Sequence, residues 1–189
     1  MNRICVASSG LGHVARGIEA WANDLANALA FRGEDVLLCK GAGEPQSKFE
    51  RGVPCWTRDA AKTRALVRSM PAAIGWRIGL GSGYAVEQTT FARNLIKILR
   101  TEEIDVLHVQ DPFVALQVQN AFRRGRIKTR TILAHGTEES LEFQKQITYL
   151  QHLAPWHRQE ADSAGVEKRT WTTIPNFIDT DLFRPGMDT

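Results

Sequence analysis

The residues at positions 9–19 carry the clearest chemical signal in the sequence, because a strand-like pattern changes there into a helical one. The preceding run 3–7 is short and apolar, and apolar residues recur at helical spacing afterwards. Gly10 and Gly12 let the backbone approach a ligand closely, and the start of the following helix offers unpaired N–H groups and a positive dipole end. The stretch therefore predicts a site for phosphate or diphosphate.

Two other interpretations of these glycines stay open. Gly10, Gly12 and Ala15 fit the loose G-x-G-x-x-G/A pattern of dinucleotide-binding enzymes. The second predicted strand, however, ends in Lys40 rather than in the acidic residue that would hold a ribose. An NADP-binding enzyme would be able to use Lys40 for its extra phosphate. Alternatively, the glycines only pack the first helix against its strand, as every doubly wound domain requires.

The composition is that of an ordinary folded domain: 189 residues, 43% hydrophobic and 24% charged, with a net charge of +3. The small net charge, without a run of consecutive Lys and Arg, gives no support for nucleic acid as a partner. Cys5, Cys39 and Cys55 form no C-x-x-C pair and lie in or beside apolar runs, which predicts reduced core cysteines in a cytoplasmic protein. We expect neither a signal peptide nor a membrane-spanning helix.

Strands and helices alternate along the chain, which predicts a Rossmann-like doubly wound α/β fold with a mostly parallel sheet flanked by helices. Strands are expected near residues 3–8, 35–39, 53–57, 104–109, 131–134 and 171–174. Helices are expected over 15–31, 58–70 with Asp59 as a possible cap, around 91–99, from 112, over 138–151 and from 155. The glycine-rich segment 72–83 is expected to be a mobile loop.

Ligands of such folds bind beyond the carboxyl ends of the strands, so the residues at those ends are the candidate site residues. His13 follows the first strand and is equally compatible with a surface turn. Asp111 follows the fourth strand and is also a plausible cap for the helix that begins at Pro112. His135 is the stronger candidate, since it ends a strand expected to face the glycines and precedes a flexible glycine. His108, inside a strand, is expected to be a packed core histidine.

Searches for other catalytic patterns return little. The five histidines and three cysteines show no metal-ligand spacing. No G-x-S-x-G motif of serine hydrolases is present. We therefore predict no metal and no cofactor, and a hydrolase has no support.

The stretch 174–185 (IPNFIDTDLFRP) resembles the I-P-N-G-V-D-x-x-x-F-x-P motif that closes the N-terminal domain of family 4 glycosyltransferases, with Phe177 where glycine is usual. Three other stretches agree with that family in order and spacing: GLGHVARGIE at 10–19, LANALAFRGEDV at 25–36, and DVLHVQD at 105–111 followed by AHG at 134–136. The resemblance thus covers nearly the whole chain. Family 4 enzymes are retaining sugar transferases of the GT-B fold, in which two Rossmann-like domains face each other across a cleft.

This resemblance implies that residues 1–175 form the acceptor-side domain and that 176–189 begin a linker to a C-terminal domain that holds most of the nucleotide-sugar. That second domain carries an E-x(7)-E pair, and no glutamate here has another eight positions on. We therefore expect one half of a hexosyltransferase, inactive without the other half, with the nucleotide-sugar, the acceptor and the C-terminal domain as partners. The family's A-D-x-V-I-x-x-S strand is not evident around 159–165, so either the last βα unit is abbreviated or this subfamily differs.

The resemblance also suggests roles for individual residues. Gly10 and Gly12 would place backbone amides near the donor diphosphate. His135 resembles the family histidine that contacts the donor sugar and stabilises charge in the transition state. Arg16 and Glu19 resemble residues of the acceptor side, and the full set that we assign to that side is His13, Arg16, Glu19 and Asp111.

The segment 58–100 is rich in basic residues, with eight Lys and Arg against Asp59 and Glu87, interleaved with apolar residues and Trp76. This pattern is typical either of a face that contacts an anionic membrane at its inner surface or of two ordinary solvated helices. We expect the acceptor to dock between this segment and the helix that starts at Arg16. Two further classes stay open: an NADP-binding oxidoreductase domain and a nucleotide-free interaction module.

Overall fold

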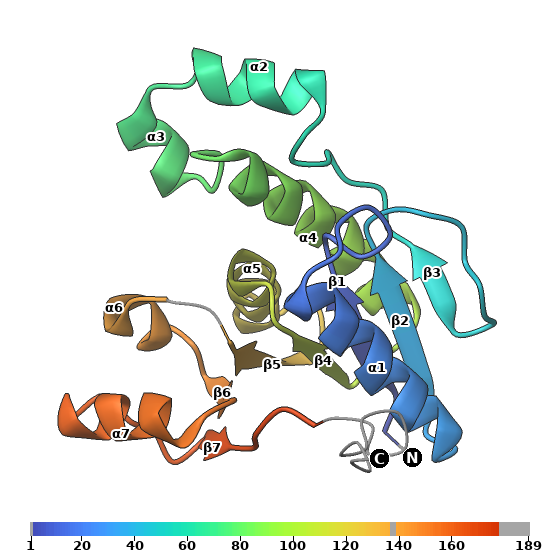
Figure 1. Ribbon diagram of the computed structural model, residues 1–189, viewed down its shortest axis with the longest axis vertical. Helices are drawn as coiled ribbons and strands as arrows, with labels where there is room; N and C mark the ends of the chain where they lie inside the picture. Colours follow the sequence, from blue (N-terminus) through green and yellow to red (C-terminus); the bar gives the residue numbers. More distant parts are fainter. Residues whose placement is uncertain (1, 137–138, 178–189) are drawn as a thin grey trace, which may run out of the picture.

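Seven strands form a single sheet at the centre of the computed structural model, which describes residues 2–136 and 139–177 (Figure 1). The sheet order is β3-β2-β1-β4-β5-β6-β7, and every neighbouring pair is parallel. The chain builds outward from β1 to β3 and then returns to β4 on the other side of β1, so the order reverses between β1 and β4. The strands are β1 Ile4–Ser8, β2 Val36–Lys40, β3 Glu50–Gly52, β4 Val106–Val109, β5 Arg130–His135, β6 Tyr149–His152 and β7 Trp171–Thr173.

Helices cover both faces of this sheet. Helix α1 (Gly17–Phe31) lies on one face, and α4 (Gly83–Thr101) packs with α5 (Pro112–Arg123) on the other (Figure 1). The shorter helices are α2 Ala61–Ser69, α3 Ala72–Arg77, α6 Leu141–Gln144 and α7 Pro155–Ser163. The predicted doubly wound α/β fold is therefore confirmed, with all strands of the sheet parallel.

Successive side chains along the strands point alternately into two separate hydrophobic cores, one on each face of the sheet. Val6 of β1 points into the core under α1, which contains Trp21. Its neighbours Cys5 and Ala7 point into the larger core under α4 and α5, where Phe91 is fully buried. Burial of such a large apolar side chain contributes about 1.5–3 kcal/mol. Within the described residues, no helix is long and apolar enough to cross a membrane.

The structure corrects two predictions between residues 50 and 83. The strand expected at 53–57 lies earlier, as β3, because Pro54 has no N–H with which to continue the ladder beyond Val53. The segment 72–83, expected to be a loop, contains α3, and α4 already begins at Gly83. The Ser82 hydroxyl caps α4 by accepting a hydrogen bond from the Ala85 N–H at 3.1 Å.

The helix expected over 138–151 is wrong, and of the two alternatives for the last unit the structure excludes an abbreviated one. The region contains the short helix α6 and then strand β6, and β6, α7 and β7 complete a parallel βαβ unit. Strand β6 lacks an apolar signature because Gln151 and His152 are buried beside Leu150. Of the predicted linker 176–189, residues 178–189 lie outside the described part of the chain, so the proposed domain boundary stays a prediction.

Candidate functional site

The glycine turn, residues 10–12, connects β1 to the segment that leads into α1. The N–H groups of His13 and Val14 donate to the Gly10 carbonyl, at 3.2 and 2.9 Å, and so close the turn. Those of Gly10, Leu11 and Gly12 donate no hydrogen bond to any residue that the structure describes. Consecutive N–H groups without an acceptor form an arrangement that suits an anion.

Both glycines also meet a packing requirement. Gly12 has a φ of 97°, and a Cβ there would lie 2.0 Å from the Ala42 carbonyl oxygen. The turn is joined to that loop by a 3.1 Å hydrogen bond from the Ala42 N–H to the Leu11 carbonyl. A Cβ on Gly10 would lie 2.1 Å from Glu19 Oε1. The glycines therefore do pack the turn, as one of the open interpretations holds, and their packing role is compatible with an anion at the N–H groups.

Asp111 ties the end of β4 to the end of β1. Its fully buried carboxylate accepts hydrogen bonds from the Ser9 N–H at 2.9 Å, the Ser9 hydroxyl at 3.0 Å and the Tyr84 hydroxyl at 3.0 Å. Burial raises the pKa of Asp111, and the hydrogen bonds from Ser9 and Tyr84 oppose that rise. Asp111 occupies the N-cap position of α5, as one alternative expected, but its side chain makes no capping bond there. Complete burial also leaves Asp111 no surface with which to touch an acceptor.

Glu87 of α4 is a second buried carboxylate in the same place. Its oxygens accept from the Arg58 N–H at 2.7 Å and from Arg58 Nη2 at 2.5 Å, and His13 Nε2 lies 2.8 Å from Glu87 Oε2. The Ser9 hydroxyl lies 3.3 Å from its other oxygen. Burial alone would raise the pKa of Glu87, but the hydrogen bonds from Arg58 and His13 outweigh it and hold the pKa below its ordinary value.

Two arginines flank the ring of Tyr84 beside these carboxylates. The guanidinium of Arg58 lies 4.4 Å from the ring centroid and that of Arg16 lies 5.4 Å from it. Arg16 also pairs with the buried Glu19 at 3.1 Å, while its own side chain is 44% exposed. The structure therefore brings α1 and the start of α4 together, at the place where we expected the acceptor.

His135 belongs to a different cluster, at the ends of β5 and β6. Its Nε2 lies 3.4 Å from the Gln144 amide nitrogen and 3.6 Å from Glu139 Oε2. Its ring is 4.5 Å from that of His157 and 5.7 Å from that of His152. Strand β4 separates β5 from β1, so His135 shares the carboxyl edge of the sheet with the glycine turn without a hydrogen bond between them among the described residues.

Two other polar residues of the strands have internal roles. Lys40 is buried, and its Nζ donates to the Glu44 carbonyl and to Glu50 Oε2, both at 2.6 Å. Lys40, the residue on which the NADP-binding alternative depended, therefore already has hydrogen-bond partners inside the protein. His108 packs edge-on against Trp21 at 5.1 Å, and burial lowers its pKa to about 4, which confirms the predicted core role.

Sequence analysis missed the centre of this constellation. Arg58, Tyr84 and Glu87 were seen only as parts of a long basic segment, whereas Arg58 turns inward to Glu87. A signal was available, because Glu87 stands on the buried side of α4 between Val86 and Phe91. An acidic residue on an apolar helix face needs a partner. The membrane-contacting role of the segment stays a prediction.

The contact at Gly12 yields a stability prediction. In Gly12→Ala, alanine has to adopt a left-handed backbone and its Cβ clashes with Ala42. In Gly33→Ala, alanine also has to adopt a left-handed backbone, at a φ of 80°, but its Cβ has open space around it. We expect Gly33→Ala to cost about 1–2 kcal/mol from the backbone alone and Gly12→Ala clearly more. Urea unfolding of the two variants measures the difference, and equal losses would contradict the packed turn.

The buried pair of Glu87 and Arg58 yields a pH prediction. Glu87→Gln leaves Arg58 without its counter-charge and should cost about 3 kcal/mol or more at neutral pH. Because the pKa of Glu87 is held below its ordinary 4.5, its stabilisation is present above that pH and is lost as the pH falls further. Urea unfolding at neutral and acidic pH should show a steeper acid loss in the wild type than in the variant. Glu142→Gln, at a carboxylate that is 78% exposed, is the matched control and should change little.

Comparison with known proteins adds evidence that is independent of this geometry. A search of curated protein sequences gave no match. The sequence model of Glycosyltransferase Family 4 matches residues 15–182. This span includes α1, α4, α5 and the residues around His135 and Glu87, but not Ser9, the glycine turn or His13. The match covers far more than half of the 189 residues. The chain therefore belongs to glycosyltransferase family 4.

Proposed function

We propose that this chain forms the acceptor-side wall of the cleft of a retaining glycosyltransferase that uses a nucleotide-sugar donor. The observation that carries the proposal is the glycine turn, whose three N–H groups lack acceptors among the described residues. The turn and His135 lie at the same carboxyl edge of a parallel sheet, where α/β proteins bind ligands. Membership of family 4 supports glycosyl transfer as the reaction.

The turn suits the leaving group of such a reaction. As the bond between the sugar and the diphosphate breaks, negative charge accumulates on the departing diphosphate oxygen. N–H groups that are already oriented towards this oxygen stabilise the charge without reorganisation. The network of Ser9, Asp111 and Glu87 beneath the turn fixes its position, so we propose positioning roles for these residues. For Asp111, we propose this positioning role in place of the contact with the acceptor that the sequence suggested.

The acceptor would bind beside the first turns of α1. A cavity of about 420 Å³ is lined there by Leu11, Arg16, Glu19 and Asn23. Glu19 Oε2 is buried without a hydrogen-bond partner in the described part of the chain, and an acceptor hydroxyl would satisfy it. Arg16 also lines this hollow, and we propose that His13, two residues beyond Leu11, completes the acceptor side.

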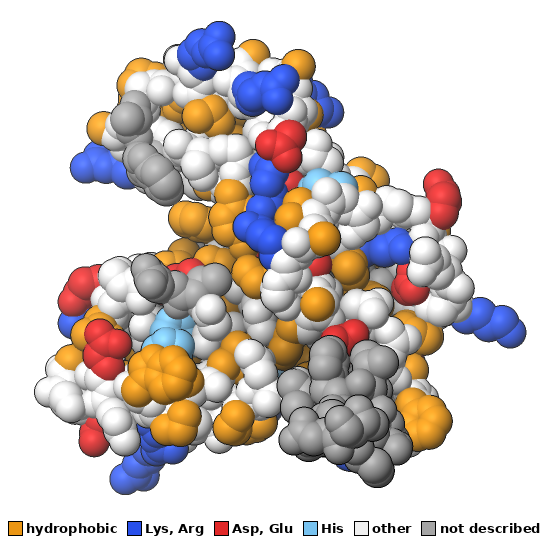
Figure 2. Space-filling view, viewed as in Figure 1, with side chains coloured by type: hydrophobic (Ala, Val, Ile, Leu, Met, Phe, Trp, Pro, Cys, Tyr) orange, Lys and Arg blue, Asp and Glu red, His pale blue; other side chains and the backbone are white. Residues whose placement is uncertain are grey.

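The wall is proposed to work with a second domain that holds the rest of the donor. In the space-filling view, the surface is hollowed between the segment of α2 and α3 and the segment of α6 and α7 (Figure 2). A partner domain of the GT-B kind would face this edge of the sheet. Without it, we expect weak donor binding and little transfer.

Nucleotide titration tests the role of the turn. In ¹H–¹⁵N NMR spectra, UDP or GDP should shift the amide signals of Gly10, Leu11 and Gly12, since the diphosphate accepts from these groups. Uridine and guanosine, which lack phosphate, are the matched controls and should leave the signals in place. Shifts with NADP alone, or equal shifts with the nucleosides, would contradict the proposal.

Substitution of His135 tests the catalytic role. In the transferase completed by its C-terminal domain, His135→Gln should lower kcat by about 10²–10³-fold, the usual effect of removing one group that stabilises transition-state charge. Initial rates of sugar transfer measure the effect. His108→Gln, at a histidine that packs against Trp21, is the control and should lower thermal stability with little change in kcat. Equal kcat in the wild type and His135→Gln would remove His135 from the mechanism.

A further inference from the structure

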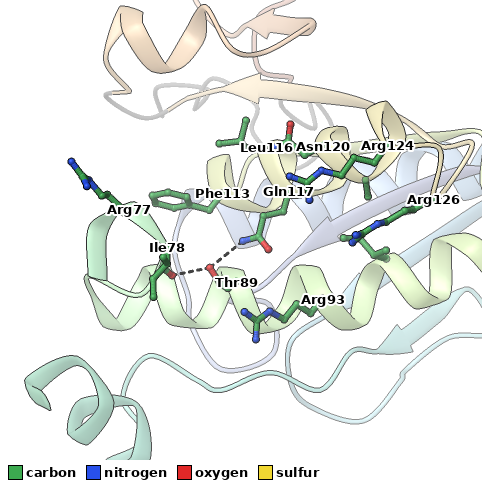
Figure 3. A pocket seen from close by; sticks show the side chains of 13 residues that line it. Arg77, Ile78, Thr89, Arg93, Phe113, Leu116, Gln117, Asn120, Arg124 and Arg126 are labelled. Atoms are coloured by element: carbon green, nitrogen blue, oxygen red, sulfur yellow. Dashed lines mark hydrogen bonds between the residues drawn. The ribbon is translucent and has the colours of Figure 1, made fainter. Parts of the chain in front are cut away.

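A second hollow, which we call the α4/α5 groove, lies between α4 and α5 and is closed at one end by the segment that follows α3 (Figure 3). Its volume is about 420 Å³. Phe113 and Arg77 lie at one end of the groove, and Arg124 and Arg126 lie at the other (Figure 3). At the usual rise per residue of a helix, Phe113 and Arg124 are about 16 Å apart along α5. The groove shares no lining residue with the glycine turn or with the network of Glu87 and Asp111.

The charge around the groove is of one sign. Four arginines line it, namely Arg77, Arg93, Arg124 and Arg126, and no Asp or Glu does. None of the four guanidinium groups has a hydrogen bond or an ion pair within the described residues. Elsewhere on the surface, arginines such as Arg51 and Arg158 pair with glutamates. A gathering of unpaired guanidinium groups favours an anion, and phosphate suits their forked geometry best.

Apolar side chains make up another part of the lining. They are Ile78, Ile96, Phe113 and Leu116, with Phe113 at the end beside Arg77 (Figure 3). The polar groups between them are largely occupied, because the Thr89 hydroxyl donates to the Gly79 carbonyl at 2.8 Å and accepts from the Gln117 amide at 3.0 Å (Figure 3). An occupant would therefore find cations at the ends of the groove and hydrocarbon along its length.

We propose that the α4/α5 groove binds a single anionic amphiphile, a phosphate headgroup that carries an alkyl chain. The alkyl chain would lie along Leu116 and Phe113, and the headgroup would meet Arg124 and Arg126 at the opposite end of the groove. The volume lies within the range of small-molecule pockets, about 300–1,000 Å³. This site goes beyond the proposed transfer reaction, because it uses the outer side of α4 and α5.

Isothermal titration calorimetry with monomeric dodecyl phosphate, below its critical micelle concentration, tests the proposal. Dodecyl phosphate should bind the chain, and binding should weaken as salt is added. The Arg124→Gln/Arg126→Gln variant should weaken binding by about tenfold or more, since each cation near an anionic headgroup contributes on the order of a fewfold in affinity. Ile78→Ser, at an exposed lining residue, should weaken the binding of dodecyl phosphate and leave that of inorganic phosphate unchanged.

The matched control is Arg100→Gln/Lys128→Gln, which removes the same charge from exposed positions outside the groove and should change the affinity less than twofold. Thermal unfolding without ligand verifies that every variant is folded. Three results would overturn the proposal: inorganic phosphate binding as tightly as dodecyl phosphate, dodecyl maltoside binding as tightly as dodecyl phosphate, or an equal loss in the control pair. The first would leave a site for free anions, the second a merely apolar groove, and the third a non-specific charge effect.

Discussion

The hydrogen bonding of two buried carboxylates, Glu87 and Asp111, determines how the central part of this molecule is assembled. A carboxylate without water needs donors on its oxygens, and these two obtain them from Ser9, Arg58 and Tyr84, with His13 beside Glu87. The donors come from the end of β1, the segment before α2 and the start of α4. Each is therefore held in place relative to the others, because loss of one partner leaves a buried charge or hydroxyl unsatisfied. The glycine turn directly follows Ser9 in the chain and is thereby attached to this network.

The parts of the fold that were predictable are those with regular apolar patterns. The unit of β1, α1 and β2, together with β4 and β5, consists of buried strands and an amphipathic helix, and its elements lie within a few residues of their predicted bounds. Strand β6 was missed because its buried side chains include an amide and an imidazole, which look like surface residues in the sequence. The start of α4 was missed because nearby glycines suggested a loop, although Ser82 provides a helix cap.

The residues of the candidate site also fall into those that were predictable from the sequence and those that were not. Gly10, Gly12 and His135 were identified from motifs, which are local in sequence. The pairing of Arg58 with Glu87 joins two segments that no local pattern connects, and only the fold reveals that one basic residue of a basic segment points inward. Other basic residues of the same segment do not turn inward but line the α4/α5 groove. Arg77 and Arg93, from that segment, line the α4/α5 groove together with Arg124 and Arg126, so one basic segment contributes residues to two chemically different places.

The buried ion pair of Lys40 and Glu50 has a consequence for how this fold changes its ligand in evolution. Dinucleotide-binding relatives of the fold carry an acidic residue near the end of the second strand, and here that place is taken by an amine bonded to a carboxylate at 2.6 Å. An acidic residue at position 40 would stand next to Glu50 as a like charge, out of contact with water. Replacing Lys40 alone by an acidic residue would therefore destabilise this protein unless Glu50 changed with it. The two positions are thus coupled, and a ribose-binding residue at position 40 would need a different neighbour at position 50.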